Sequence, residues 1–220
     1  MDSKNISSGS ALRTYRLAVA ATGEYTQFHG GSVERALAAI VTTINRVTVL
    51  YERDFAIRLT LVADESKIIY TDPATDPYTA QDASGLADQN QPNLDATIGN
   101  ANYDLGHVFT VGNGGVGAPG LCVSGVKAQG ATGLDQPIAD SYDIDYVAHE
   151  VIHQLGGDHT FNSSAEGCDK NRNAATAFEP GSGSTAASYS GLCTDANLQS
   201  ASDDYFHSGS YLQVIDFVTN

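Results

Sequence analysis

The chain has 220 residues, an apolar fraction of 41% and a formal net charge of −15 at pH 7. This length is sufficient for one substantial domain or for two small subdomains around a cleft. The acidic charge argues against nucleic acid and against an anionic membrane surface as partners, because phosphate groups bind clustered lysine and arginine. No run of about 18 apolar residues occurs, so no membrane-spanning helix is expected.

The start of the chain, at 1–12, is polar and contains no secretory signal peptide. We expect this stretch to be disordered, or to be an artificial or cut start. If the native protein is exported, its signal and any pro-segment lie outside this chain.

Two acidic loops, at 71–77 and 140–145, raise the question of calcium binding. Neither contains the twelve-residue pattern of a calcium loop, so the expectation of Ca²⁺ is weak. Solubility is the simpler explanation of the acidic charge.

The first 64 residues predict a strand, a long helix and a second strand. Alternating apolar residues predict strands at 13–20 and 56–64. Between them, Ser32 suits the N-cap position of a helix that ends near Tyr51. The apolar stripe of this helix consists of Val33, Leu37, Ile40, Val41, Ile44 and Val47. Elements in this order predict a parallel crossover connection.

Shorter elements follow in the rest of the chain. They are a polar, turn-rich stretch at 70–91, a short helix at 93–100, a buried strand at 104–111, a glycine-rich loop at 112–120, an edge strand within 121–130, a helix over 144–155 and a last helix near 208–218. Asp143 or Asp145 could cap the helix over 144–155. Because Gly, Ser, Asn and Asp dominate after Gly156, we divide the chain into an N-terminal subdomain, 13–156, and a C-terminal subdomain, 157–220.

The segment "HEVIHQLGGDH" at 149–159 contains three histidines and one glutamate at a spacing suited to zinc. His149 and His153 are four residues apart, so a helix presents both imidazoles on one face. Gly156 permits the left-handed turn that brings His159 back to the same point. Three nitrogen ligands leave the fourth zinc position open for water, which is the arrangement of a catalytic site, and Glu150 can reach that water.

The other histidines receive a different interpretation. His107 lies in the middle of a predicted strand and is expected to be a hydrogen-bonded core residue. His29 and His207 lie beside predicted helices, and we assign neither to the metal.

Cysteine spacing gives no sign of a cysteine zinc cluster, because Cys122, Cys168 and Cys193 form no CxxC pair. Cys168 and Cys193 flank one loop-rich stretch and could form a disulfide, which would leave Cys122 over. Free buried thiols are the alternative.

The motif "HEVIHQLGGDH" matches HExxHxxGxxH, the long zinc signature of the metzincin metallopeptidases. The wider segments "YDIDYVAHEVIHQLGGDHTFN", "EPGSGSTAASYSGLC", "SDDYFH" and "RTYRLAVAATGEYTQFHGG" resemble the bacterial reprolysin-like, adamalysin-related branch. The resemblance covers most of the chain. It implies an α/β fold with a twisted, mixed and mostly parallel sheet, a long backing helix, a zinc helix and a smaller irregular C-terminal subdomain.

The resemblance also implies an activity, that of a secreted zinc-dependent endopeptidase acting on protein or peptide substrates. The substrate would pair with an edge strand, which we place within 114–126. We expect a monomer with one catalytic Zn²⁺.

By the same resemblance, His149, His153 and His159 are the zinc ligands, and Glu150 is the general base. Tyr189 is either a further ligand or hydrogen-bond donor at the zinc, or a packed aromatic. The residues expected to line the primary specificity pocket are Ser190, Gly191 and Leu192.

One departure from the family pattern concerns the Met-turn beneath the zinc. Relatives carry a methionine in the segment that matches "STAASYSG" at 184–191, where this chain has Ala187. Since that methionine is not a zinc ligand, its absence weakens packing rather than chemistry. The departure leaves open a catalytically weak or inactive module that binds zinc and peptide. A hydrolase of non-peptide amides would share the same site.

Overall fold

The computed structural model describes residues 10–112 and 114–220. Most of the start predicted for 1–12 therefore lies outside the described residues. Within the described ranges, no helix combines the length and the apolar character that crossing a membrane requires.

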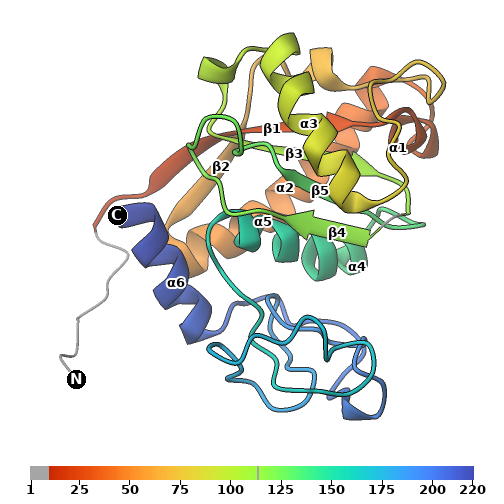
Figure 1. Ribbon diagram of the computed structural model, residues 1–220. Helices are drawn as coiled ribbons and strands as arrows, with labels where there is room; N and C mark the ends of the chain where they lie inside the picture. The colour runs from red at the N-terminus through yellow and green to blue at the C-terminus, as the bar shows by residue number, and fades with distance from the viewer. Residues whose placement is uncertain (1–9, 113) are drawn as a thin grey trace.

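Five strands form one sheet in the order β2-β1-β3-β5-β4 (Figure 1). They are β1 (Arg13–Ala21), β2 (Ile57–Leu61), β3 (Leu105–Thr110), β4 (Gly114–Gly117) and β5 (Gly130–Gly133). Neighbouring strands are parallel except β4, which runs antiparallel to β5 and forms one edge. The predicted mixed, mostly parallel sheet is confirmed.

Helices cover both faces of the sheet. Successive side chains of a strand point to opposite faces, so the apolar residues of β1 need a covering helix on each side. Leu17 and Val19 of β1 belong to the core beneath helix α2 (Val33–Phe55). Ala18 and Ala20 belong to a second core beneath helix α3 (Ala83–Thr97). Short helices α1 (Gly23–Phe28), η1 (Glu65–Ile68) and η2 (Asn100–Asn102) connect these elements.

Helix α2 is the long backing helix, and Ser32 caps it by accepting a hydrogen bond from the Arg35 N–H. It ends at Phe55 rather than near Tyr51, because Phe55 continues the buried stripe by one more turn. Ala56, at φ 54°, then terminates it in the left-handed conformation. The predicted stripe is wrong at Val41, which is 38% exposed.

The prediction of a short helix at 93–100, after a polar, turn-rich stretch, is wrong in its bounds, because the structure has the longer helix α3 (Ala83–Thr97). Its buried face carries amide side chains where apolar ones would have revealed the period. Asn90 donates to the Ala128 carbonyl at 2.8 Å, and Gln91 accepts from the Ala128 N–H at 2.8 Å. Because polar residues fill core positions here, hydrophobic periodicity could not reveal the helix.

The glycine-rich loop predicted at 112–120 contains the edge strand β4, and the strand predicted within 121–130 is replaced by turns that lead into β5. Glycine has low strand propensity, so three glycines in β4 hid it. The edge strand still falls within the predicted range, 114–126.

The helix predicted over 144–155 starts earlier than predicted, at Asp140. It consists of three pieces, α4 (Asp140–Tyr142), a π-helical turn η3 (Asp143–Ala148) and α5 (His149–Gln154). Neither predicted aspartate is an N-cap. Asp143 accepts from the Thr43 hydroxyl at 2.7 Å, and Asp145 accepts from the Ser202 N–H at 2.7 Å.

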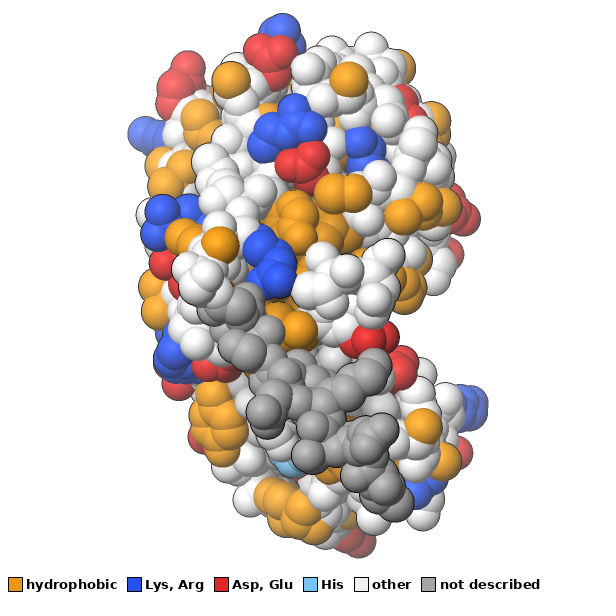
Figure 2. Space-filling view, turned by 90° about the vertical axis from the view of Figure 1, so that its left-hand side faces the viewer, with side chains coloured by type: hydrophobic (Ala, Val, Ile, Leu, Met, Phe, Trp, Pro, Cys, Tyr) orange, Lys and Arg blue, Asp and Glu red, His pale blue; other side chains and the backbone are white. Residues whose placement is uncertain are grey.

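The chain after Gly156 is mostly irregular, with one turn η4 (Thr194–Ala196) and the last helix α6 (Ser208–Thr219). The irregular segment lies below α4 and α5, while α6 packs against α2 (Figure 1). In profile, the molecule is hollowed at one edge between the part that contains the sheet and the irregular segment below it (Figure 2). The core is continuous across Gly156, since Ala187 and Val214 share a cluster with residues of α2. The division at Gly156 stays a prediction.

Candidate active site

Three histidine side chains converge where α5 ends. His149 and His153 lie one turn apart on this helix. Gly156, at φ 81°, then turns the chain back so that His159 approaches both of them. The three Nε2 atoms form a triangle in which every side is 3.1 Å.

The other ring nitrogen of each histidine contacts a backbone carbonyl. The acceptors for His149, His153 and His159 are the oxygens of Ala186, Gly157 and Asn171, at 2.8, 2.7 and 2.7 Å. Because a carbonyl only accepts, each Nδ1 carries the hydrogen and each Nε2 presents a lone pair to the centre of the triangle. Burial lowers the pKa of all three imidazoles, that of His159 to about 4, so all are neutral at pH 7.

Three lone pairs directed at one point suit a cation. Tetrahedral zinc, with Zn–N bonds of about 2.0–2.1 Å, requires nitrogens about 3.3 Å apart, which is close to the spacing here. Among the described residues, no other group of three His, Cys, Asp or Glu side chains is close enough to share an ion. The site can therefore hold a metal ion, and the acidic loops at 71–77 and 140–145 give the expectation of calcium no support.

Helix α5 is fixed to the sheet by a buried polar network. His107 of β3 contacts Gln154 through Nδ1 and Thr132 through Nε2, both at 2.8 Å. Gln154 in turn donates to the Gly106 carbonyl at 2.9 Å. The prediction that His107 is a hydrogen-bonded core residue is confirmed. The network sets the position of the helix that carries two of the three histidines.

Glu150 is only 7% exposed, and burial raises the pKa of its carboxyl group to about 8. Strand β4 passes directly over it. A Cβ atom at Gly115 would lie 2.4 Å from the Glu150 Oε1 atom, and one at Gly117 would lie 2.1 Å from the Glu150 carbonyl oxygen. The glycines of β4 are therefore required for the sheet edge to approach the site this closely.

Tyr189 is brought next to the histidines. Its ring centroid lies 4.6 Å from that of His159 and 5.6 Å from that of His149. The ring also stacks on Phe161 at 4.6 Å. Burial raises the pKa of its phenol to about 12, so the hydroxyl keeps its proton at neutral pH. Tyr189 is thus both packed and placed at the metal centre.

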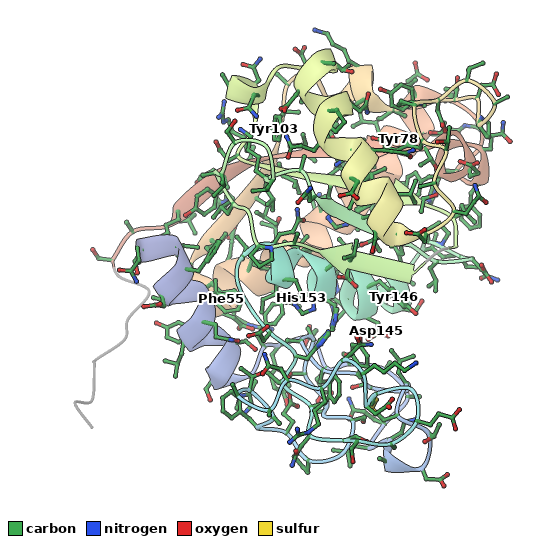
Figure 3. The ribbon with its side chains drawn as sticks, in the orientation of Figure 1. Phe55, Tyr78, Tyr103, Asp145, Tyr146 and His153 are labelled. Carbon is green, nitrogen blue, oxygen red and sulfur yellow. A yellow bond between two sulfur atoms is a disulfide. The ribbon has the colours of Figure 1, made fainter. Side chains whose placement is uncertain are left out.

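A pocket of about 330 Å³ opens beside His149 and Glu150. Its remaining lining consists of Gly115, Leu134, Ser141, Asp145, Tyr146, Ser188, Tyr189, Ser190, Gly191, Leu192, Ser200 and Ser202. The three residues expected at a specificity pocket, 190–192, are all among them. Figure 3 shows Asp145, Tyr146 and His153 along the helical segment that faces the irregular C-terminal part. The sequence suggested Asp145 as a helix cap and as part of an acidic loop, but not as a residue of this pocket.

The turn beneath the histidines is held by a carboxylate that the sequence did not single out. Glu179 is buried and accepts from the backbone N–H groups of Ser184 and Thr185, at 2.8 and 3.1 Å. Ala186 and Ala187 follow and are fully buried. A lone glutamate in a glycine- and serine-rich stretch was the only available signal.

Cys168 and Cys193 form a disulfide with a Cα–Cα distance of 5.2 Å, and Cys122 is a free thiol. The disulfide belongs to a small core with Phe161, against which Tyr189 packs. It therefore links the irregular segment to the aromatic side of the metal centre.

Comparison with protein families gives a match over residues 11–217, to the family described as "Metallo-peptidase family M12B Reprolysin-like". The chain belongs to this family. Membership of this family accounts for the three-histidine cluster.

A comparison with curated proteins gives no match to this reprolysin-like chain. Solved structures do match it in fold. One similar structure is titled "Structure of a chaperone-substrate complex", with 13% identity and a TM-score of 0.50. The match covers 93% of this chain but only 34% of that one, and at this identity it shows the fold alone.

Proposed function

We propose that the protein is a zinc-dependent endopeptidase. The observation that carries the proposal is the triangle of unprotonated Nε2 atoms, 3.1 Å apart, with the Glu150 carboxyl group beside it in the same pocket. Three neutral nitrogens suit zinc, whereas calcium takes oxygen ligands. An open coordination position and an adjacent carboxylate are the parts that hydrolysis requires.

In this mechanism His149, His153 and His159 hold the zinc ion. Bound zinc supplies Lewis acidity, which activates water and polarises a peptide carbonyl. Glu150 accepts the proton of the attacking water and passes it to the leaving amine. A nearby cation favours the carboxylate form of Glu150, which counteracts the rise of its pKa by burial.

The substrate is positioned by strand β4. As the last strand of the sheet, β4 has backbone groups available on its outer side, and an extended peptide can pair with them. Because glycines let the backbone of β4 lie directly against Glu150, a peptide paired with this strand stays close to Glu150. Tyr189 donates a hydrogen bond to the oxygen on which negative charge develops.

The proposed setting is extracellular, with the protein acting as a monomer on protein or peptide substrates. The Cys168–Cys193 disulfide supports secretion, because disulfides persist in oxidising compartments. The subdomain boundary at Gly156 would then separate the upper and lower walls of the cleft.

The decisive test combines metal analysis with cleavage of quenched peptides. We expect one zinc per chain, loss of activity with a chelator and recovery on adding zinc. Glu150→Gln should retain zinc but lose at least about 10²-fold in kcat. Cleavage that survives both the chelator and Glu150→Gln would refute the proposal.

The second candidate is a module that binds zinc and peptide without cutting. The observation that favours it is Ala187, which lies in the turn beneath the histidines where family relatives carry methionine. One stoichiometric zinc and measurable peptide affinity, with no cleavage across a broad library, would support this candidate over the peptidase.

A further inference from the structure

The pocket beside His149 and Glu150 has polar walls, and their chemistry defines what can bind there. On the proposed peptidase function, this pocket receives a substrate side chain directly beside the bond that is cut. Pocket-lining groups then decide which residue the enzyme accepts at that position.

Three serine hydroxyls that line the pocket already donate their hydrogen to backbone carbonyls. Ser141 donates to the Ile138 carbonyl at 3.2 Å, Ser188 to the Thr185 carbonyl at 2.6 Å and Ser190 to the Gly183 carbonyl at 3.2 Å. A hydroxyl whose proton is committed to a carbonyl offers only lone pairs to a further partner. This part of the lining is therefore rich in hydrogen-bond acceptors.

Asp145 adds a negative charge to the same lining. Its Oδ1 atom accepts from the Ser202 N–H at 2.7 Å, which fixes the side chain against the opposite wall. In the described part of the chain, no lysine or arginine forms an ion pair with Asp145. Arg46 forms its ion pairs with Asp140 and Asp204.

The electrostatic surroundings of Asp145 are also negative. Burial raises the pKa of its carboxyl group, hydrogen bonds from Ser202 oppose that rise, and Asp140 adds to it. Among residues 10–112 and 114–220, no lysine or arginine lines the pocket, and the chain carries a net charge of −15. A cleft lined by one sign of charge concentrates ligands of the opposite sign.

The apolar part of the lining suits a long aliphatic stem. Leu134 and Leu192 line the pocket together with the serines and Asp145. Lysine and arginine bury such a stem while their charged end reaches a polar partner. Both side chains carry only donors, three in lysine and five in arginine, which matches walls that offer acceptors.

We propose that this pocket selects lysine or arginine directly beside the scissile bond, with Asp145 as the specificity-determining residue. The inference rests on the proposed peptidase function. It commits to cationic peptides as the substrate class, and it predicts poor cleavage beside acidic residues because Asp145 repels them.

A peptide library analysed by mass spectrometry tests the proposal on the zinc-loaded protein. We expect most cuts to have Lys or Arg at one fixed side of the bond. Cleavage with apolar preference at both flanking positions would overturn the inference while leaving the peptidase function intact. Absence of cleavage would instead count against the peptidase function, and the pocket is then tested by binding alone.

The binding arm uses the zinc-loaded Glu150→Gln protein and matched peptides that differ in one residue, Lys, norleucine or Glu. By calorimetry, we expect the Lys peptide to bind at least about tenfold more tightly than the norleucine peptide. Equal affinities for the Lys and Glu peptides would overturn the inference.

The variant Asp145→Asn keeps an oxygen that can accept from the Ser202 N–H but removes the charge. We expect kcat/KM for a Lys peptide to fall at least about tenfold, with little change for the norleucine peptide. Asp135→Asn is the matched control, because Asp135 is exposed and adjoins Leu134 without lining the pocket. An equal loss for both peptides would mean that Asp145 only supports the wall.

Discussion

Each histidine of the metal centre has one nitrogen held by a backbone carbonyl and the other directed at the shared point. These carbonyls fix the tautomer before any metal binds, so the site is preorganised for a cation. Burial adds to this by keeping the imidazoles neutral. At the residue scale, two of these three acceptors, Ala186 and Asn171, lie outside the motif, so the site also depends on hydrogen bonds that the motif does not contain.

Tyr189 can be tested separately from zinc binding. Tyr189→Phe keeps the ring that stacks on Phe161 but removes the hydroxyl. We expect zinc content and KM to change little and kcat to fall about 10- to 100-fold, because a donor to the developing oxyanion is lost. An unchanged kcat would mean that Tyr189 is a packed aromatic only.

Glu65 provides a residue-scale test of stability. Its Oε1 atom accepts from the Val19 N–H at 2.8 Å, its Oε2 atom has no partner among the described residues, and burial raises its pKa from 4.5 to about 8. Between these values the folded protein binds a proton that the unfolded chain releases. The contribution of Glu65 to the free energy of unfolding should therefore fall as pH rises from about 4.5 to 8.

Glu65→Gln should remove this dependence and stabilise the protein at pH 8 by a few kcal/mol. Urea unfolding of both proteins at pH 5 and pH 8 measures the effect. Equal slopes of stability against pH for the two proteins would contradict the assignment.

At the element scale, β4 and α5 are packed together so closely that only glycine fits between them. We expect Gly115→Ala to displace either Glu150 or the strand, because the added Cβ would lie 2.4 Å from the Glu150 Oε1 atom. Activity should fall at least about tenfold, since small displacements of a catalytic group are costly. The histidines are untouched, so zinc content measured on the same sample should stay at one per chain, and full activity would disprove the predicted clash.

At the scale of the whole molecule, one covalent link restrains the irregular segment below the cleft. The Cys168–Cys193 disulfide closes a sequence separation of 25 residues. Replacing both cysteines by serine should lower the free energy of unfolding by roughly 3 kcal/mol. Denaturant unfolding with and without reductant measures this loss. Cys122→Ser is the control, because Cys122 is a free thiol and its replacement should leave stability nearly unchanged.

Local sequence patterns were sufficient to predict the histidine cluster and those helices and strands that have a regular apolar pattern. The spacing of His149, His153 and His159 predicted the ligand cluster, because a helix turn and a glycine reversal are local geometry. The strands β1 and β3 and the helix α2 were predicted from apolar periodicity. Helix α3 and strand β4 were not, since amides fill the buried face of one and glycines form most of the other.

Tertiary structure alone decided what surrounds the cluster. The carbonyl of Ala186 that fixes His149 is 37 residues away in sequence, and the Ser202 N–H that holds Asp145 is 57 residues away. No local pattern encodes such contacts, because they arise when the irregular segment folds back beneath α5. The sequence by itself determined which atoms can hold a metal, whereas the fold decided their protonation, their access to solvent and the acceptor-rich pocket beside them.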